Sequence, residues 1–176
     1  MRLFIALNIP EEIRKKLYEE AVLLKKEGMF EGKVTGKDNL HLTLKFLGDV
    51  EEEKVGEIKE RLNGISLGKF DVMLGGLGVF DENFVRIIWA SLLGVEELQG
   101  EVDRVLLGMF PREERFMGHV TIARVKNVKE KRSLIDRLKV VRLDNFKFRV
   151  ESFELMKSEL SKSGPEYEVL EKIELG

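Results

Sequence analysis

The chain has 176 residues, of which 43% are hydrophobic, and its formal net charge is -2. This length predicts one domain over residues 1–176, with two lobes, and the near-neutral charge excludes a protein that coats nucleic acid through bulk positive charge. The chain has no cysteine, which excludes a disulfide framework, a thiolate nucleophile and a cysteine-based zinc site, and makes a cytoplasmic location the expected one.

No targeting or membrane signal is expected. The first seven residues are largely apolar, but Asn8, Pro10 and two glutamates follow at once, so this stretch is too short for a signal sequence or a membrane span. Charged residues make up 35% of the chain with both signs interleaved, a composition that resembles heat-adapted proteins.

The first part of the chain carries strand and helix signals on both sides of His41. The acids after Pro10 favour a helix start, and the spacing of Asp49 and Glu52 resembles a capping box. The predicted elements are a buried strand at 3–7, a helix at 10–28, a polar loop at 32–39, a strand from His41 and a helix from Asp49 to Gly64.

The second part predicts a hairpin followed by alternating helices and strands. Its stretch Gly75 to Gly78 has no following Gly-Lys-Ser/Thr and no helix, so a β-bulge or a close backbone approach is favoured over a phosphate loop. The predicted elements are strands at 70–80 and 84–92, a helix at 95–105, a loop at 108–117, a strand from His119, a helix at 128–139, a strand at 146–155 with a bulge near Glu151, and a last strand after a turn at 161–165.

Two short motifs carry the functional interpretation, His41-Leu42-Thr43-Leu44 and His119-Val120-Thr121-Ile122, and they use both histidines of the chain. Their alternation of polar and apolar residues predicts half-buried strands, on which each histidine shares a face with the threonine two residues later. If the two strands lie side by side, two imidazoles and two hydroxyls converge.

The order strand, helix, loop and His-x-Thr-x strand occurs in each half of the chain. It predicts a duplicated α+β unit with pseudo-twofold symmetry, which would place the equivalent histidines across a central groove. Because the strands and helices are too few, a doubly wound parallel sheet is not expected.

Two histidines on opposite walls suit acid–base catalysis, since one can take a proton while the other gives one near neutral pH. A single His-x-Thr-x would indicate only a strand with polar residues, but two copies that use every histidine favour a function. Zinc binding is disfavoured, because the chain has no third histidine, no cysteine and no His-Glu-x-x-His spacing. No cofactor or metal is expected.

The sequence resembles the two-histidine phosphoesterase superfamily, specifically the bacterial and archaeal 2'-5' RNA ligase / RNA 2',3'-cyclic phosphodiesterase family. The resemblance covers almost the whole chain. It rests on five stretches: Arg2-Leu3-Phe4-Ile5-Ala6, the ten residues from Asn39 to Gly48, Arg86-Ile87-Ile88-Trp89, the six residues from His119 to Arg124, and the ending from Ser158 to Tyr167. One departure is Met117-Gly118 where relatives commonly have proline before the second histidine, which implies a less fixed backbone at the entry to His119.

The resemblance implies a bilobal α+β fold with two antiparallel sheets facing a central cleft and helices outside. It also implies an RNA 2',3'-cyclic phosphodiesterase that forms a 2'-phosphate without a metal, with His41 as the general acid on O3' and His119 as the general base. Thr43 and Thr121 would hold the phosphate oxygens.

Five further side chains are candidates for substrate contacts. The resemblance places Arg124 near the phosphate, although strict alternation from His119 would turn it away, so a bulge or a strand end is needed. Lys45 has the parity to face the cleft as a second phosphate-binding cation. Phe46 and Trp89 could stack on a base, but their core-facing parity favours packing. Arg86 is a weaker candidate for contact with the RNA backbone.

Two alternatives stay open. A 2'-5' RNA ligase would join the cyclic phosphate to a 5'-hydroxyl end, and a noncatalytic RNA-end-binding protein would use the same groove without turnover. The expected partner is an RNA 3' end with a 2',3'-cyclic phosphate, of which tRNA fragments are one candidate source. The protein is expected to act in RNA processing, as a monomer.

Overall fold

The computed structural model describes residues 1–176 and contains four α-helices, one short 3-10 helix and nine strands. The strands are β1 (Arg2–Asn8), β2 (Glu31–Val34), β3 (His41–Asp49), β4 (Phe70–Val79), β5 (Ile87–Leu93), β6 (His119–Asn127), β7 (Lys147–Val150), β8 (Ser152–Ser161) and β9 (Gly164–Glu174). The helices are α1 (Glu11–Lys26), the 3-10 helix (Lys37–Asn39), α2 (Glu52–Asn63), α3 (Glu96–Val105) and α4 (Lys131–Lys139).

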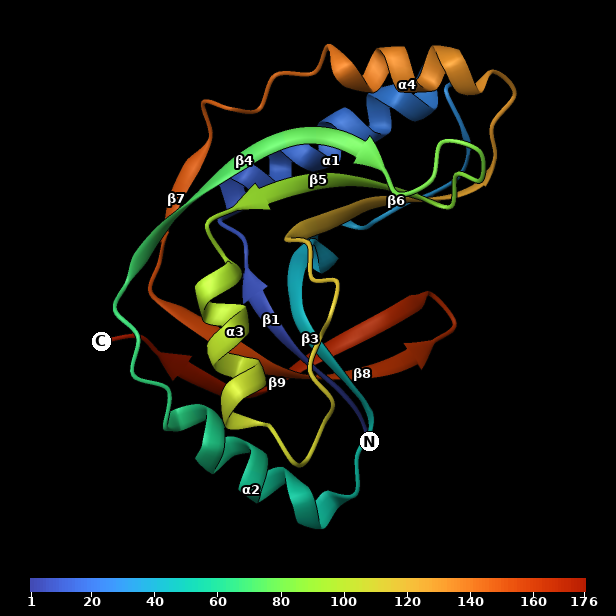
Figure 1. Cartoon of the computed structure of the whole chain (residues 1–176). Helices are drawn as coiled ribbons and strands as arrows, with labels where there is room; N and C mark the ends of the chain where they lie inside the picture. Colours follow the sequence, from blue (N-terminus) through green and yellow to red (C-terminus); the bar gives the residue numbers. More distant parts are fainter.

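The strands form two antiparallel halves that meet at the centre of a curled sheet (Figure 1). The order is β7-β4-β5-β6-β3-β1-β8-β9, and β2 pairs with β6 beside this path. The central strands β3 and β6 pair through Leu42 with Val120. The order is symmetrical about this pair, so that β3 corresponds to β6 and β1 to β5, as the repeat in the sequence predicted.

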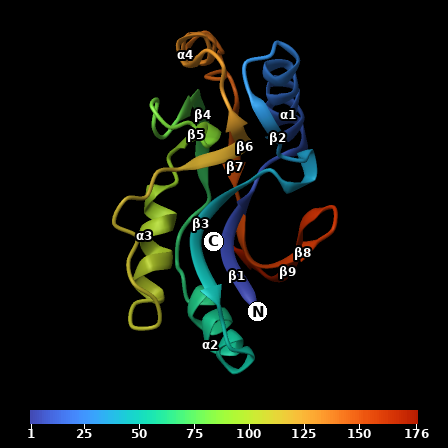
Figure 2. The same cartoon turned by 90° about the vertical axis from the view of Figure 1, so that its right-hand side faces the viewer.

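The helices cover the sheet in two pairs. Helices α1 and α4 lie together at one end of the molecule, and α2 and α3 lie at the other (Figures 1 and 2). The first pair contacts β2, β4 and β6, and the second pair contacts β3 and β9. One hydrophobic cluster of 40 buried residues runs through both halves, which is what one domain requires; the single-domain assignment stays a prediction.

The predicted α+β fold with antiparallel strands and outer helices is confirmed, with four differences in detail. The two sheets are joined at Leu42 and Val120 instead of being separate. The predicted polar loop at 32–39 contains β2 and the 3-10 helix. Asp49 belongs to β3, and no side chain caps α2. The predicted bulge near Glu151 is a break, because β7 pairs with β4 while β8 pairs with β1 in the other half.

The glycine stretch in β4 serves packing. The pairing of β4 with β5 is irregular between Leu74 and Leu77, and a Cβ on Gly78 would overlap the Trp89 indole. The predicted bulge and close approach are therefore confirmed.

Candidate active site

Strands β3 and β6 bring the two His-x-Thr-x motifs together. Because Leu42 and Val120 are antiparallel partners, His41 lies toward Thr121 and Thr43 toward His119. Directly opposite residues in such a pair have Cβ atoms about 5 Å apart, and diagonal neighbours about 7–8 Å. The two histidines occupy one diagonal of these four positions, and the two threonines occupy the other. We call this surface the histidine face.

Both imidazoles are held in the same way. Nδ1 of His41 lies 2.7 Å from the Asn39 carbonyl oxygen, and Nδ1 of His119 lies 2.7 Å from that of Met117. A carbonyl oxygen only accepts, so each Nδ1 carries a proton and donates it. Each Nε2 is therefore the nitrogen that can accept a proton, and in neutral His41 it accepts a hydrogen bond from the Thr43 hydroxyl at 3.1 Å.

Aromatic rings support the two imidazoles. The Phe4 and Tyr167 ring centroids lie 5.1 Å and 5.2 Å from that of His41, the latter edge to face. Phe80 approaches His119 edge to face at 5.0 Å. Each histidine thus has a fixed ring plane, set by one backbone bond and at least one aromatic contact.

The environment favours the neutral form of His41. Burial lowers the pKa of His41, positive charge on His119 lowers it further, and the hydrogen bond to the Asn39 carbonyl acts in the opposite direction. A bound anionic phosphate would raise the pKa of His41, so that the imidazole would bind a second proton.

A matched pair of β-bulges changes the face on which residues beyond each motif lie. The pairing of β1 with β3 skips Leu44, and the pairing of β5 with β6 skips Ile122. Both strands show the same sequence of buried and exposed positions. After the bulge, Lys45 turns to the core and Phe46 to the histidine face, and Arg124 takes the place in β6 that Phe46 has in β3.

The prediction that Lys45 faces the substrate is wrong. Its side chain is 3% exposed and pairs with Asp103 of α3 at 2.5 Å. Its ammonium group also donates to the Pro111 carbonyl at 2.6 Å, while Asp103 accepts from Gln99 and from the Glu113 N–H. Lys45 therefore anchors α3 and the 106–118 loop to β3.

Arg124 reaches the histidine face through the bulge that its role required. Ile87, Trp89 and Ser91 alternate along β5 and pair with Arg124, Thr121 and His119 respectively. Arg124 is exposed, and its charge also acts on the pKa of Tyr167, which burial raises.

The packing prediction is wrong for Phe46, and for Trp89 the core-facing parity is wrong although its indole packs against Gly78 and Phe80. Phe46 pairs with Phe4 on the histidine face and is 73% exposed. Trp89 pairs with Thr121 on the same face, where its ring lies 5.8 Å from Phe80. Arg86 precedes β5, and its guanidinium stacks on Phe84 at 4.3 Å.

Gly118 contradicts the expectation of a loosely held backbone before His119. Its carbonyl accepts from the Leu92 N–H at 2.8 Å. A Cβ at this position would come within 2.5 Å of the Leu92 carbonyl oxygen and of a Val95 methyl carbon. The absence of a side chain lets β5 and the start of α3 close on the chain at this point.

Sequence reasoning missed Tyr167, Phe80 and Lys33. The sequence places Tyr167 in a strand and Phe80 at a strand end, but nothing in it indicates that their rings contact the histidines. For Lys33 it predicts a loop, whereas the residue lies in β2 opposite Arg124. The alternation over Glu31–Val34 was the available signal, but four residues are few for identifying a strand.

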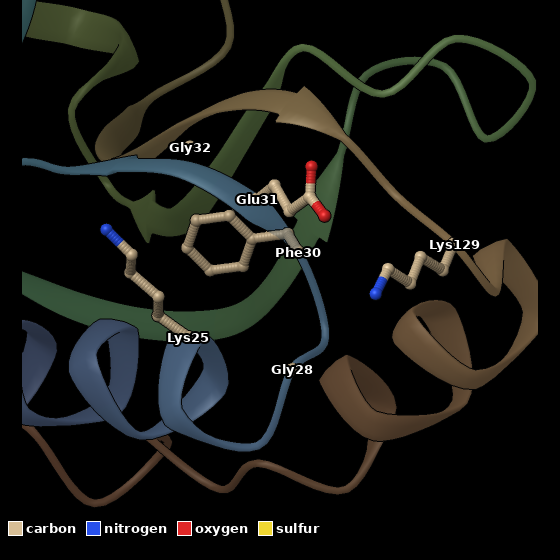
Figure 3. A pocket seen from close by; sticks show the side chains of 6 residues that line it. All are labelled: Lys25, Gly28, Phe30, Glu31, Gly32 and Lys129. Atoms are coloured by element: carbon tan, nitrogen blue, oxygen red, sulfur yellow. The ribbon is translucent and has the colours of Figure 1, made fainter.

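Two cavities lie away from the histidines. One of about 420 Å³ is lined by Lys25, Gly28, Phe30, Glu31, Gly32 and Lys129 (Figure 3), and one of about 320 Å³ lies near Pro10 and Arg149. No three His, Asp or Glu side chains form a group that could hold a metal ion. No helix has the length and apolar character needed to cross a membrane.

Comparisons with known proteins agree with this geometry. The family described as LigT like phosphoesterase matches residues 7–89 and 93–167. A Methanocaldococcus jannaschii protein named RNA 2',3'-cyclic phosphodiesterase is 36% identical over 98% of this chain and 99% of its own length. Relatives of the same name in Archaeoglobus fulgidus and Thermotoga maritima are 32% and 34% identical over 99% and 97% of this chain and 100% and 93% of their own lengths.

Solved structures show the same fold. A Thermus thermophilus protein superposes with a TM-score of 0.79 and 31% identity, covering 99% of this chain and 98% of that one. Escherichia coli LigT in complex with 3'-AMP gives a TM-score of 0.77 over 99% of this chain and 97% of that one, at 23% identity, and so supports the fold alone.

Proposed function

This chain belongs to the LigT-like phosphoesterase family, and from that premise we propose that it is an RNA 2',3'-cyclic phosphodiesterase. The observation that carries the proposal is the convergence of the two His-x-Thr-x motifs across the Leu42–Val120 pair. Relatives at 31–36% identity over nearly their full length are named for the same activity. The substrate is RNA, and the enzyme is a phosphoric diester hydrolase.

The mechanism needs only the proton-transfer groups of the chain. A water oxygen attacks the phosphorus of the cyclic phosphate while the bond from phosphorus to O3' breaks. Nε2 of neutral His119 takes the proton of the water, and Nε2 of protonated His41 gives a proton to O3'. The product then carries a 2'-phosphate.

The backbone hydrogen bonds suit both proton-transfer roles. Donation from Nδ1 of His119 to the Met117 carbonyl leaves a lone pair on Nε2, as a general base requires. His41 starts neutral because burial lowers its pKa. The negative charge of the bound substrate would raise that pKa and so favour protonation of His41. The general acid is therefore charged only when there is a leaving group to receive the proton.

The threonines and Arg124 stabilise the charge that develops on the phosphoryl oxygens. Thr43 and Thr121 occupy the other diagonal of the four positions, where their hydroxyls can donate to two non-bridging oxygens. Arg124 adds a positive charge further along β6 on the same face. We propose that the activity is cytoplasmic, as the absence of cysteine favours, and that the protein acts as a monomer.

The test is product analysis with an RNA fragment that ends in a 2',3'-cyclic phosphate, with and without a fragment that has a 5'-hydroxyl. Opening of the cyclic phosphate in water, retained after exhaustive chelation of divalent metals, supports the proposal. Joining of the two fragments in place of opening would make the protein a ligase. Binding without any turnover would make it a noncatalytic RNA-end-binding protein.

A further inference from the structure

Lys33 and Arg124 lie side by side on the histidine face. Strand β2 lies beside β6 (Figure 2) and pairs with it just beyond the point where β3 and β6 separate. In this pairing Lys33 is the partner of Arg124. Paired residues in an antiparallel sheet project from the same face. Since Arg124 shares a face with His119 and Thr121, Lys33 does too.

The two cations have no acidic partner. Like charges directly opposite each other in a sheet are destabilising, and neither Lys33 nor Arg124 forms an ion pair. Other arginines and lysines of the chain do so, for example Arg137 with Glu27 and Lys59 with Glu171. The hydrogen bond that Lys33 makes, to the Ser163 carbonyl at 3.4 Å, leaves two of its three donors free.

Lys33 lies too far along the sheet to serve the phosphate between the histidines. Thr121 and Arg124 are three residues apart, which is roughly 10 Å along a strand, and β2 lies a further 4.8 Å or so to the side. Arg124 can reach toward the threonines, while the Lys33 ammonium group is offset by one strand. A second phosphate of the same RNA strand is the anion that such an offset suits.

We propose that Lys33, with Arg124 beside it, binds the phosphodiester that joins the terminal nucleotide to the rest of the RNA. The inference rests on the proposed function of the histidine face. It makes the enzyme selective for an oligoribonucleotide end over a mononucleoside cyclic phosphate, because the mononucleoside has no phosphate to occupy this position.

The competing role for Lys33 is structural, as a contact that holds the tip of the β8–β9 hairpin through Ser163. The hairpin also has a hydrogen bond from Asn39 to the Pro165 carbonyl at 3.1 Å. If Lys33 only held the hairpin, which carries Tyr167 against His41, its loss would slow all substrates equally. Selective loss on the longer substrate distinguishes the two roles.

The test compares adenosine 2',3'-cyclic phosphate with the dinucleotide ApA that ends in a 2',3'-cyclic phosphate. The variants are Lys33→Met, which keeps the apolar stem, Lys33→Arg, which keeps the charge, and Lys147→Met as a matched control on the exposed edge strand β7. The wild type should have a higher kcat/KM for the dinucleotide. Lys33→Met should reduce this preference about tenfold, through KM, as loss of a charge-assisted hydrogen bond predicts.

Lys33→Arg should keep most of the preference, and Lys147→Met should behave as the wild type. The slope of log K against log salt concentration for dinucleotide binding should also be shallower in Lys33→Met. The expected difference is about 0.7, the contribution of one phosphate contact on a single strand. Equal losses on both substrates, or no loss on either, would overturn the inference while leaving the proposed function intact. Inactivity of the wild type toward both substrates would overturn the proposed function, and the inference with it.

Discussion

The ammonium group of Lys45 lies 2.5 Å from Asp103 Oδ1, and each side chain is 3% exposed. Removing one member of a buried pair leaves the other charge uncompensated, which typically costs about 3–5 kcal/mol. Lys45→Met should therefore lower the free energy of unfolding by that amount, measured by denaturant titration. The double variant Lys45→Met/Asp103→Leu should recover much of the loss.

The control for this prediction is Lys59→Met, which breaks an exposed pair with Glu171 and should cost less than about 1 kcal/mol. A Lys45→Met protein as stable as the control would mean that the pair is not buried as the structure shows.

Gly118→Ala should impair both stability and turnover. The new Cβ would meet the Leu92 carbonyl and Val95, so β5 or the start of β6 must shift, at a typical cost of about 1–3 kcal/mol. Because the shift occurs next to His119, kcat should fall in protein that is still folded. Gly56→Ala in α2 is the matched control, since a Cβ there meets nothing and should stabilise the helix by up to about 1 kcal/mol.

The pKa of His41 should be below the ordinary value of about 6.5 in the free protein, because burial and the charge of His119 lower it. Binding of a nucleoside 2'-phosphate should raise it. The chain has two histidines, so NMR titration of the wild type and of His119→Gln assigns both imidazoles. A free-protein pKa for His41 at or above the ordinary value would contradict the burial shown here.

His41→Gln and His119→Gln should each lower kcat by at least about 10²-fold. Glutamine keeps much of the side-chain volume against Phe4, Tyr167 and Phe80, so the unfolding midpoint should change little. Turnover close to that of the wild type in either folded variant would rule out a mechanism that needs both histidines.

Hydrolysis should yield a 2'-phosphate and leave O3' free. The water must attack in line with the leaving oxygen, and a pocket that fixes the phosphate between Thr43, Thr121 and Arg124 can align one of the two ester oxygens only. Phosphorus NMR of the product distinguishes the isomers. A predominant 3'-phosphate would mean that the substrate lies in the opposite orientation and that His41 and His119 have the wrong roles.

The sequence by itself determined the local features of this protein. Period-two alternation in the His41 and His119 motifs, together with apolar periodicity in the helices, was enough to predict the α+β class, the duplicated unit and the four residues that converge. These features depend on side chains a few positions apart, which share a face whatever the rest of the chain does.

The tertiary structure decided which residues surround those four. The bulges at Leu44 and Ile122 arise from the pairing of β3 with β1 and of β6 with β5, and they turn Lys45 into the core and bring Phe46 and Arg124 to the histidine face. Tyr167 contacts His41 from β9, far from both motifs in sequence, and Lys33 comes to lie opposite Arg124 through the pairing of β2 with β6. Strand pairing joins segments that are distant in sequence. A one-residue shift in that pairing turns every later side chain to the opposite face of the strand, and the local sequence alone did not predict it here.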